Sequence, residues 1–229
     1  NKLYGGTINL MGKSFRKFGW NAVFVDNDNP EAFRAAVTEK TRAIFVESLA
    51  NPGGVIVDLE AIAKIAQEAE VPLIVDNTMA TPWLCRPFEW GADLVVHSTT
   101  KFLSGQGNAM GGIVIDSGRF PWFGNAKYPS LSEPSPDYNG LTFAETFGDM
   151  AFTLYSHAVS LRDLGCTQSP MNAWITLNGV ETLPLRMERH VENAQKVAGF
   201  LQQHPSVEWV SYAGLSSSPY YQLAQKYLQ

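Results

Sequence analysis

Few cysteines, no long apolar run and no excess of positive charge set the first limits on this chain. Its 229 residues include only Cys85 and Cys166, which are not spaced as a metal-binding pair, so we expect a reducing, cytoplasmic environment. No apolar run approaches the roughly 18 residues that a membrane span needs. A formal net charge of −5 offers no basic surface for nucleic acid. These absences argue against a membrane protein and against a nucleic-acid-binding protein.

The overall composition is that of a globular protein. Hydrophobic residues make up 45% of the chain and charged residues 17%. The length allows one large domain or two modest ones, with enough residues for a packed core. The chain starts at Asn1 without a methionine and stops at Gln229 inside an amphipathic stretch. We therefore expect it to be an internal piece of a longer protein.

Short apolar runs alternate with helical patterns over the first half of the chain. Asn29-Pro30-Glu31 predicts the start of a helix, and Asp58 predicts the cap of another that extends to Glu70. A further helix is predicted over residues 7–18. Strands are predicted at residues 22–25, 43–46, 71–75, 93–96 and 111–115. This alternation indicates an α/β fold with a largely parallel sheet.

The pattern changes after Asp116. Residues 117–140 are rich in proline, serine and aromatic side chains and predict an ordered surface excursion. Helical patterns follow at residues 143–164, 170–177 and 183–203, and residues 207–210 predict a strand. We expect residues 1–188 to form a large domain. Residues 189–229 would form a linking helix and the start of a smaller C-terminal α/β domain.

Two of the predicted strands end in side chains of complementary chemistry. Asp76 follows the run 71–75, and the run 93–96 leads into His97-Ser98-Thr99-Thr100-Lys101. Parallel sheets bind their ligands at the carboxyl ends of the strands. That edge would carry an amine for an aldehyde, a carboxylate for a pyridine nitrogen and hydroxyls for a phosphate. Lys101, Asp76, Ser98 and Thr100 are therefore the groups needed to hold pyridoxal 5′-phosphate (PLP).

Tyr4 and Asn51 are weaker candidates for the same site. Tyr4 precedes two glycines, so its ring can lie over a flat cofactor, and Asn51 follows a predicted strand end, where it can hydrogen-bond a ring oxygen. Without Lys101, a core tyrosine and a turn asparagine would be the more common explanations. The four histidines show no metal-binding spacing, so no metal site is expected.

The segment Gly12-Lys13-Ser14 resembles the end of a phosphate-binding loop. That motif requires a glycine five residues before Gly12, where this chain has Thr7, and it requires a preceding strand. Nucleotide binding is therefore a remote alternative.

The segments around the candidate residues resemble the Cys/Met-metabolism family of PLP-dependent enzymes. The resemblance lies in residues 3–7, 47–52, 75–78, 85–87, 91–93, 97–101, 105–107 and 183–190. It extends over essentially the whole chain, and the motif that ends in Lys101 is highly specific. It implies the large domain of a fold-type I PLP-dependent transferase over residues 1–188, with a mostly parallel sheet and flanking helices.

The resemblance also implies a role for each candidate residue. Lys101 would bond to the cofactor aldehyde and act as the catalytic acid and base, and Asp76 would pair with the pyridine nitrogen. Ser98 and Thr100 would bind the phosphate. Tyr4 would be a catalytic residue whose ring stacks on the cofactor. Asn51 would contact the phenolic oxygen of the cofactor.

Within the family, residues 105–112, 116–120 and 138–140 are most similar to the O-acetylhomoserine sulfhydrylases. The implied reaction is a γ-replacement in which sulfide or a thiol displaces acetate from O-acetyl-L-homoserine, giving homocysteine or methionine. Cystathionine γ-synthase or methionine γ-lyase chemistry, a succinyl ester and a noncatalytic module remain alternatives. The resemblance also implies a homo-oligomer, usually a tetramer. Family members are longer, so a phosphate loop, a neighbouring subunit's tyrosine and arginine, and a substrate-binding arginine would lie outside this chain.

Overall fold

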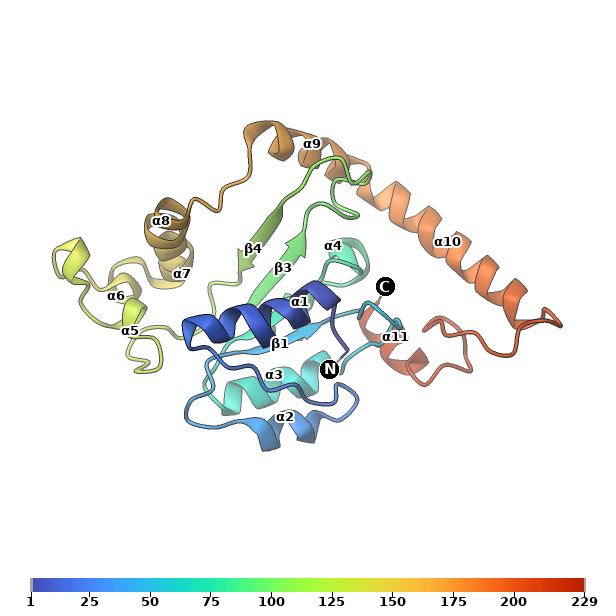
Figure 1. The fold of residues 1–229 in the computed structure, drawn as a ribbon, viewed down its shortest axis with the longest axis horizontal. Coiled ribbons are helices and arrows are strands. Elements are labelled where there is room, and N and C mark those ends of the chain that lie inside the picture. The colour runs from blue at the N-terminus through green and yellow to red at the C-terminus, as the bar shows by residue number, and fades with distance from the viewer. Residues whose placement is uncertain (1, 229) are drawn as a thin grey trace.

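The fold is built on one sheet of four strands, whose order is β1-β2-β3-β4 (Figure 1). A computed structural model describes residues 2–228. The strands are β1 (Ile44–Glu47), β2 (Leu73–Asp76), β3 (Leu94–Ser98) and β4 (Gly112–Asp116). The first three are parallel to one another, and β4 is antiparallel to β3. The predicted α/β fold with a mostly parallel sheet is therefore confirmed.

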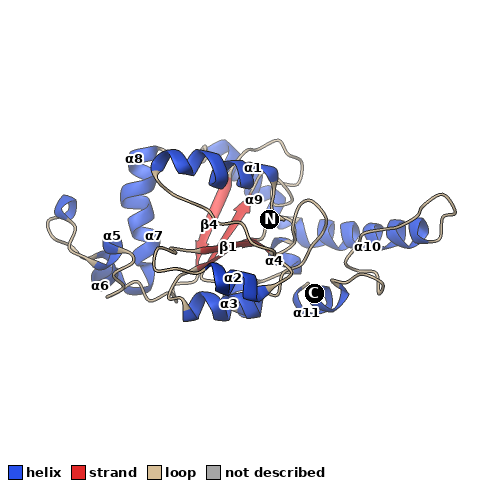
Figure 2. Ribbon diagram, turned by 60° about the horizontal axis from the view of Figure 1, so that its bottom comes forward, coloured by secondary structure: helices blue, strands red, loops and turns tan. Residues whose placement is uncertain are grey.

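Helices cover both sides of this sheet. Figure 2 shows α1 on one side of the strands and the pair α2 and α3 on the other. The α-helices are α1 (Gly5–Asn9), α2 (Pro30–Ala36), α3 (Leu59–Glu68), α4 (Thr81–Leu84), α5 (Pro129–Ser132), α6 (Phe143–Phe147), α7 (Ala151–Tyr155), α8 (Arg162–Leu164), α9 (Pro170–Glu181), α10 (Leu183–Gln202) and α11 (Tyr221–Tyr227). A π-helical and a 3₁₀ stretch continue α1 to Phe18, as the helical pattern of residues 7–18 predicts.

Local capping signals determine where two of the helices begin. The Asn29 side chain accepts a hydrogen bond from the Glu31 N–H at the start of α2. The Asp58 side chain accepts one from the Ala61 N–H at the start of α3. Each bond satisfies a backbone donor that the first helical turn leaves without a partner. Both predicted helix starts are therefore confirmed.

The main hydrophobic core lies between the sheet and helices α2 and α3. The inner face of α3 contributes four buried residues, Leu59, Ile62, Ile65 and Ala66. Three residues from the C-terminal segment join the same core, namely Ala213, Ala224 and Tyr227. The end of the described chain is therefore packed on the sheet that carries the candidate site.

The surface excursion forms an aromatic core of its own. Phe120, Trp122 and Leu131 pack with Phe143, Ala144 and Ala151, so the segment is ordered by burial against α6 and α7. Trp122 stacks on Phe152 with ring centroids 5.4 Å apart. The expected ordered excursion is confirmed.

Two predicted strands are wrong. Residues 22–25 do not join the sheet, and Val23 is 72% exposed. Residues 207–210 are irregular, and Trp209 is 75% exposed. An apolar run becomes a strand only where it is built into a sheet with other strands. The four-stranded sheet that the structure describes consists of β1 to β4 and includes neither run.

The long helical pattern of residues 143–164 is also interrupted. Gly148 adopts a φ of +54° at the end of α6, which a continuous right-handed helix does not allow. The chain continues as a 3₁₀ turn, α7, a π-helical stretch and α8.

Among the helices of residues 2–228, none is both long and apolar enough to cross a membrane.

Candidate active site

The carboxyl ends of the three parallel strands bring polar side chains to one edge of the sheet. Glu47 is the last residue of β1, Asp76 the last of β2 and Ser98 the last of β3. Glu47 and Asp76 are direct partners in the register of β1 and β2. Parallel α/β sheets bind ligands at this edge. The predicted placement of Asp76 and Ser98 at neighbouring strand ends is therefore confirmed.

Thr78 links the Asp76 carboxylate to the end of β3. Its hydroxyl donates to Asp76 Oδ1 at 2.5 Å, and its backbone N–H donates to the same oxygen at 2.9 Å. The Thr78 hydroxyl oxygen also accepts a hydrogen bond from the Ser98 N–H at 2.8 Å. These bonds fix the orientation of the Asp76 carboxylate through Oδ1. Among residues 2–228 no hydrogen bond reaches Oδ2, which is left to meet a further donor.

Lys101 lies in the turn that follows β3. Its N–H donates to the Ser98 carbonyl at 3.3 Å, and its carbonyl accepts from the Gly105 N–H at 2.9 Å. The turn therefore places Lys101 directly beside the strand end that carries Ser98. The side chain is exposed, and none of the ion pairs within residues 2–228 involves its ammonium group. The amine is free to react with a ligand at this edge.

Thr100 is anchored to the chain that enters β4. Its hydroxyl oxygen accepts a hydrogen bond from the Gly111 N–H at 3.1 Å. A Cβ at Gly111 would lie 2.6 Å from the Thr99 hydroxyl oxygen, so only glycine allows this close approach. Gly111 therefore holds the Thr100 hydroxyl in place beside Lys101.

Tyr4 and Asn51 are brought together by a residue that the sequence prediction did not assign to the site. Glu47 is buried, and its two carboxylate oxygens accept hydrogen bonds from the Tyr4 N–H at 2.6 Å and the Asn51 N–H at 3.0 Å. The ring of Tyr4 is half exposed and lies over Gly6, where a Cβ would come within 2.5 Å of a ring carbon. Both weaker candidates therefore lie at the β1 end of the same edge.

Burial controls the ionisation of two groups beside the site. It raises the pKa of the Glu47 carboxyl, and the nearby Asp76 charge adds to that effect, while the two backbone N–H donors oppose it. Burial also lowers the pKa of His97, and the charge of Asp76 opposes that shift. His97 is therefore neutral at neutral pH, and its Nδ1 is buried without a hydrogen-bond partner in residues 2–228.

The chemistry of these donors fits PLP. The edge carries an exposed amine at Lys101, a fixed carboxylate with a free oxygen at Asp76, and hydroxyls at Ser98 and Thr100. The Tyr4 ring adds an exposed aromatic surface whose position depends on the missing side chain of Gly6. An aldehyde, a protonated ring nitrogen, a phosphate and an aromatic ring each meet a suitable partner in this set.

Glu47 and Thr78 are the site residues that sequence reasoning missed. Glu47 stands directly at a predicted strand end, as Asp76 does, so its position was a usable signal. Thr78 lies two residues after Asp76, the spacing at which a carboxylate accepts bonds from the following turn. The contact of Glu47 with Tyr4 spans 43 residues and has no signal in the local sequence.

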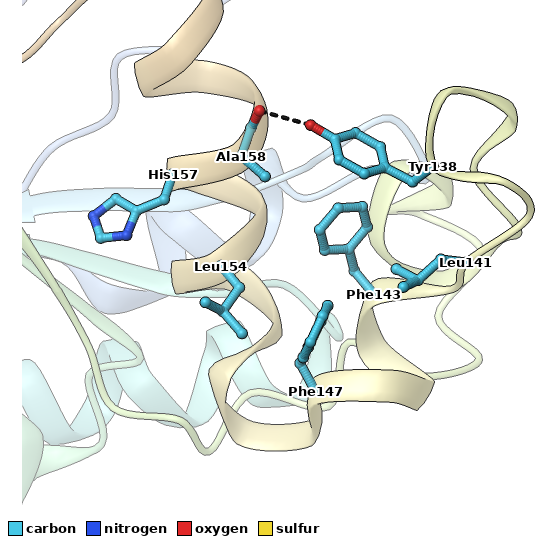
Figure 3. Close-up of a pocket in the computed structure, with 7 residues that line it drawn as sticks. All are labelled: Tyr138, Leu141, Phe143, Phe147, Leu154, His157 and Ala158. Atoms are coloured by element: carbon cyan, nitrogen blue, oxygen red, sulfur yellow. Dashed lines mark hydrogen bonds between the residues drawn. The ribbon is translucent and has the colours of Figure 1, made fainter.

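An open apolar pocket lies away from this edge, in the aromatic core of the excursion (Figure 3). Its volume is about 380 Å³, and no acid, lysine or arginine lines it. Figure 3 shows the ring of His157 on the other side of its helix from Tyr138 and Phe143. The Tyr138 hydroxyl donates to the Ala158 carbonyl at 2.6 Å. This pocket therefore lacks the groups that an amine-and-carboxylate cofactor site requires.

The glycine-lysine-serine segment is not a phosphate-binding loop. Residues 10–14 are helical, and the segment that leads directly into them is the helix α1 rather than a strand. A phosphate loop needs backbone N–H groups exposed between a strand and a helix. The nucleotide-binding alternative therefore has no structural support.

Comparison with known proteins agrees with the geometry of the site. A family described as "Cys/Met metabolism PLP-dependent enzyme" matches residues 1–229. An O-acetyl-L-homoserine sulfhydrylase from Leptospira meyeri is 52% identical over 235 residues, which cover 99% of this chain and 53% of that protein. A homocysteine synthase from Schizosaccharomyces pombe is 45% identical over 229 residues, which cover 99% of this chain and 53% of that protein.

A solved structure shows the same fold. It is a protein from Campylobacter jejuni described as an O-acetylhomoserine (thiol)-lyase, with a pyridoxyl-lysine monophosphate. The TM-score is 0.96 at 40% identity, and the match covers 100% of this chain and 57% of that one. This chain thus spans about half the length of the relatives it matches. By sequence and by fold, it belongs to the Cys/Met-metabolism family of PLP-dependent enzymes.

Proposed function

We propose that this chain forms the cofactor-binding part of an O-acetylhomoserine sulfhydrylase. The reaction is a γ-replacement in which sulfide or a thiol displaces acetate from O-acetyl-L-homoserine, giving homocysteine or methionine. The observation that carries this proposal is the set of Lys101, Asp76, Ser98 and Thr100 at one sheet edge. The relatives named for this reaction support the choice of substrate.

Asp76 and Lys101 perform the two central tasks in this proposal. Bound PLP supplies an electron sink that stabilises negative charge at the substrate carbons next to its amine. The Asp76 carboxylate, held by Thr78, would keep the pyridine nitrogen of the cofactor protonated. The Lys101 amine removes the proton from the substrate α-carbon and then moves a proton at the β-carbon, so that acetate leaves and sulfide adds.

The remaining residues bind and orient. Ser98 and Thr100 hydroxyls hold the phosphate, and the Thr100 oxygen is fixed for this by the Gly111 N–H. The Tyr4 ring would stack on the cofactor, and Tyr4 would be a catalytic residue. Asn51 would hold the phenolic oxygen of the cofactor. We also propose that residues 1–188 form the PLP-binding large domain, and that residues 189–229 form a linking helix and the start of a smaller C-terminal domain.

The proposal extends to the whole protein. The relatives are about twice as long as this chain, so we expect residues beyond it to complete the site. A cytoplasmic homotetramer is the assembly we propose, and Cys85 and Cys166 are both free thiols, as a reducing compartment requires.

An assay with three reaction mixtures tests the proposed reaction. The full-length protein, loaded with PLP, is given O-acetyl-L-homoserine with sulfide, with methanethiol, or with neither. We expect homocysteine or methionine together with acetate, and little acetate release when no sulfur nucleophile is present. Release of acetate and a 2-oxo acid at the same rate without sulfide would instead identify a γ-lyase.

Two protein variants complete this experiment. Lys101→Ala is expected to lower turnover by at least about 100-fold, because proton transfer at the substrate carbons loses its acid and base. The 229-residue chain alone is expected to turn over far more slowly than the full-length protein. Equal turnover of the two would contradict the claim that residues beyond this chain complete the site.

A further inference from the structure

Glu47 has a geometry that neither the proposed chemistry nor the core of the fold accounts for. It is a buried carboxylate with 4% of its surface exposed, and it forms no ion pair within residues 2–228. A buried ionised carboxylate is costly unless hydrogen bonds satisfy it. Its carboxylate accepts hydrogen bonds from two backbone N–H groups, those of Tyr4 and Asn51.

Each carboxylate oxygen of Glu47 accepts one of these two hydrogen bonds. Oε1 accepts from the Tyr4 N–H at 2.6 Å, and Oε2 accepts from the Asn51 N–H at 3.0 Å. Tyr4 is the N-cap residue that directly precedes α1, and Asn51 lies in the loop after β1. One side chain at the end of β1 thus ties the start of α1 and a loop to the sheet edge.

We propose that Glu47 is a positioning residue that sets the Tyr4 ring and the Asn51 side chain against bound PLP. The proposal rests on the proposed function, since Tyr4 and Asn51 are assigned there to the cofactor. Both tied residues are exposed, so little packing by neighbouring side chains fixes their positions. Hydrogen bonds to a charged acceptor are strong enough to replace that packing.

The negative form of Glu47 is the form that this role requires. An ionised carboxylate accepts at both oxygens, and each of the two N–H groups needs an acceptor. Glu47→Gln keeps the size of the side chain but turns one acceptor into an NH₂ donor, which faces an N–H. Glu47→Asp keeps the charge but is one methylene shorter, so both oxygens move away from the two amides.

Asp93 offers a matched control. It also accepts a backbone bond, from the Leu73 N–H to its Oδ2 at 2.8 Å, and burial also raises the pKa of its carboxyl. It lies before β3, at the opposite end of the strands from the site. Asp93→Asn therefore tests whether losing the charge of any partly buried acid produces the same effect, or whether the effect depends on the position of Glu47 beside Tyr4 and Asn51.

The experiment uses the full-length protein and two independent measurements. Amide hydrogen exchange, followed by NMR without cofactor, reports the hydrogen bonds of Tyr4 and Asn51 directly. The dissociation constant for PLP and the circular dichroism of its bound ring report the position of the cofactor. The exchange measurement needs no cofactor, so it still decides on Glu47 if the proposed reaction itself fails.

We expect Glu47→Gln to speed exchange at the Tyr4 or Asn51 amide by about 10- to 100-fold and to weaken PLP binding by a similar factor. The dichroism of the bound ring should also change, while Asp93→Asn leaves all three readouts near wild type. Glu47→Asp should shift the same readouts in the same direction. If Glu47→Gln does not fold, the Glu47→Asp variant provides the test of the proposal. Unchanged exchange at both amides, unchanged PLP binding, or an equal change in Asp93→Asn would overturn the proposal.

Discussion

Asp93 is a residue whose environment gives the protein a defined pH dependence. Burial raises the pKa of its carboxyl, the Leu73 N–H and the Arg119 charge oppose this, and the Asp116 charge adds to it. The folded protein therefore holds this proton to a higher pH than the unfolded chain, where the pKa is about 3.9. Between the pKa of the unfolded chain and the higher pKa of the folded protein, the folded state binds more protons. Its stability therefore falls as the pH rises through this range.

Asp93→Asn should remove this component of the pH dependence. The asparagine oxygen still accepts from the Leu73 N–H, and no charge is buried. We expect the free energy of unfolding of the variant, relative to wild type, to increase between about pH 3 and about pH 7. Urea unfolding at both pH values measures this, and a difference that stays constant with pH would contradict it.

Glu68 should behave in the opposite way and serves as the comparison. Its ion pair with Arg34 lowers the pKa of its carboxyl, so its contribution is present at neutral pH and lost as the pH falls. Glu68→Gln should therefore lose stability relative to wild type as the pH rises. Both groups of this pair are largely exposed, so the effect should be small.

At the level of elements, the turn that carries Lys101 is tied to the junction of α9 and α10. The Arg186 guanidinium donates to the carbonyl of Phe102 at 2.8 Å and to that of Gly179 at 2.7 Å. A Cβ at Gly179 would lie 2.4 Å from the Leu103 carbonyl oxygen, so the two segments are in close contact. These contacts fix the segment that follows the reactive lysine against two long helices.

Arg186→Ala should loosen this junction. It leaves carbonyls of Phe102 and Gly179 without their charged donor, and we expect a loss of about 1.5–3 kcal/mol in the free energy of unfolding. Arg189→Ala is the control, because Arg189 lies on the same helix and its ion pair, with Glu192, is exposed. That control should change stability by less than about 1 kcal/mol. Similar losses in both variants would argue against a specific clamp by Arg186.

The elements also show what the sequence predicts and what it does not. The starts of α2 and α3 were predictable, because Asn29 and Asp58 cap those helices through bonds within three residues. The strands at residues 22–25 and 207–210 were predicted wrongly, because strand pairing depends on neighbours distant in sequence. The same limit applies to the site. The positions of Asp76, Ser98 and Lys101 could be predicted because these residues stand at or just after strand ends. The contact of Glu47 with Tyr4 depends on how the chain folds between two residues that are 43 positions apart.

At the level of the whole molecule, the C-terminal segment is part of the main core. Tyr227 of α11 is 2% exposed and packs edge-on against Trp90. Its hydroxyl donates to Asp58 Oδ1 at 2.5 Å and accepts from the Glu60 N–H at 3.2 Å. The last helix of the described chain is therefore bonded to the N-terminal end of α3. Glu60, in that end, lies 167 residues before Tyr227 in the sequence.

Tyr227→Phe should measure how strongly this segment is joined to the rest. The variant keeps the packing of the ring but removes a bond to a charged acceptor, so we expect a loss of about 1.5–3 kcal/mol in urea unfolding. Tyr221→Phe is the matched control on the same helix, since its hydroxyl forms no side-chain hydrogen bond within residues 2–228. If both variants are equally stable, the bond to Asp58 contributes nothing to stability.

The central claim is that Lys101 at the end of β3 is the residue that bonds to PLP. Borohydride reduction of the full-length protein loaded with PLP, followed by peptide mass mapping, tests it most directly, because reduction converts a bond between a lysine amine and the aldehyde into a stable link. The account predicts a pyridoxyl-phosphate group on the peptide that contains Lys101 and its loss in Lys101→Ala. An unmodified Lys101 peptide, or a label on another lysine alone, would contradict it.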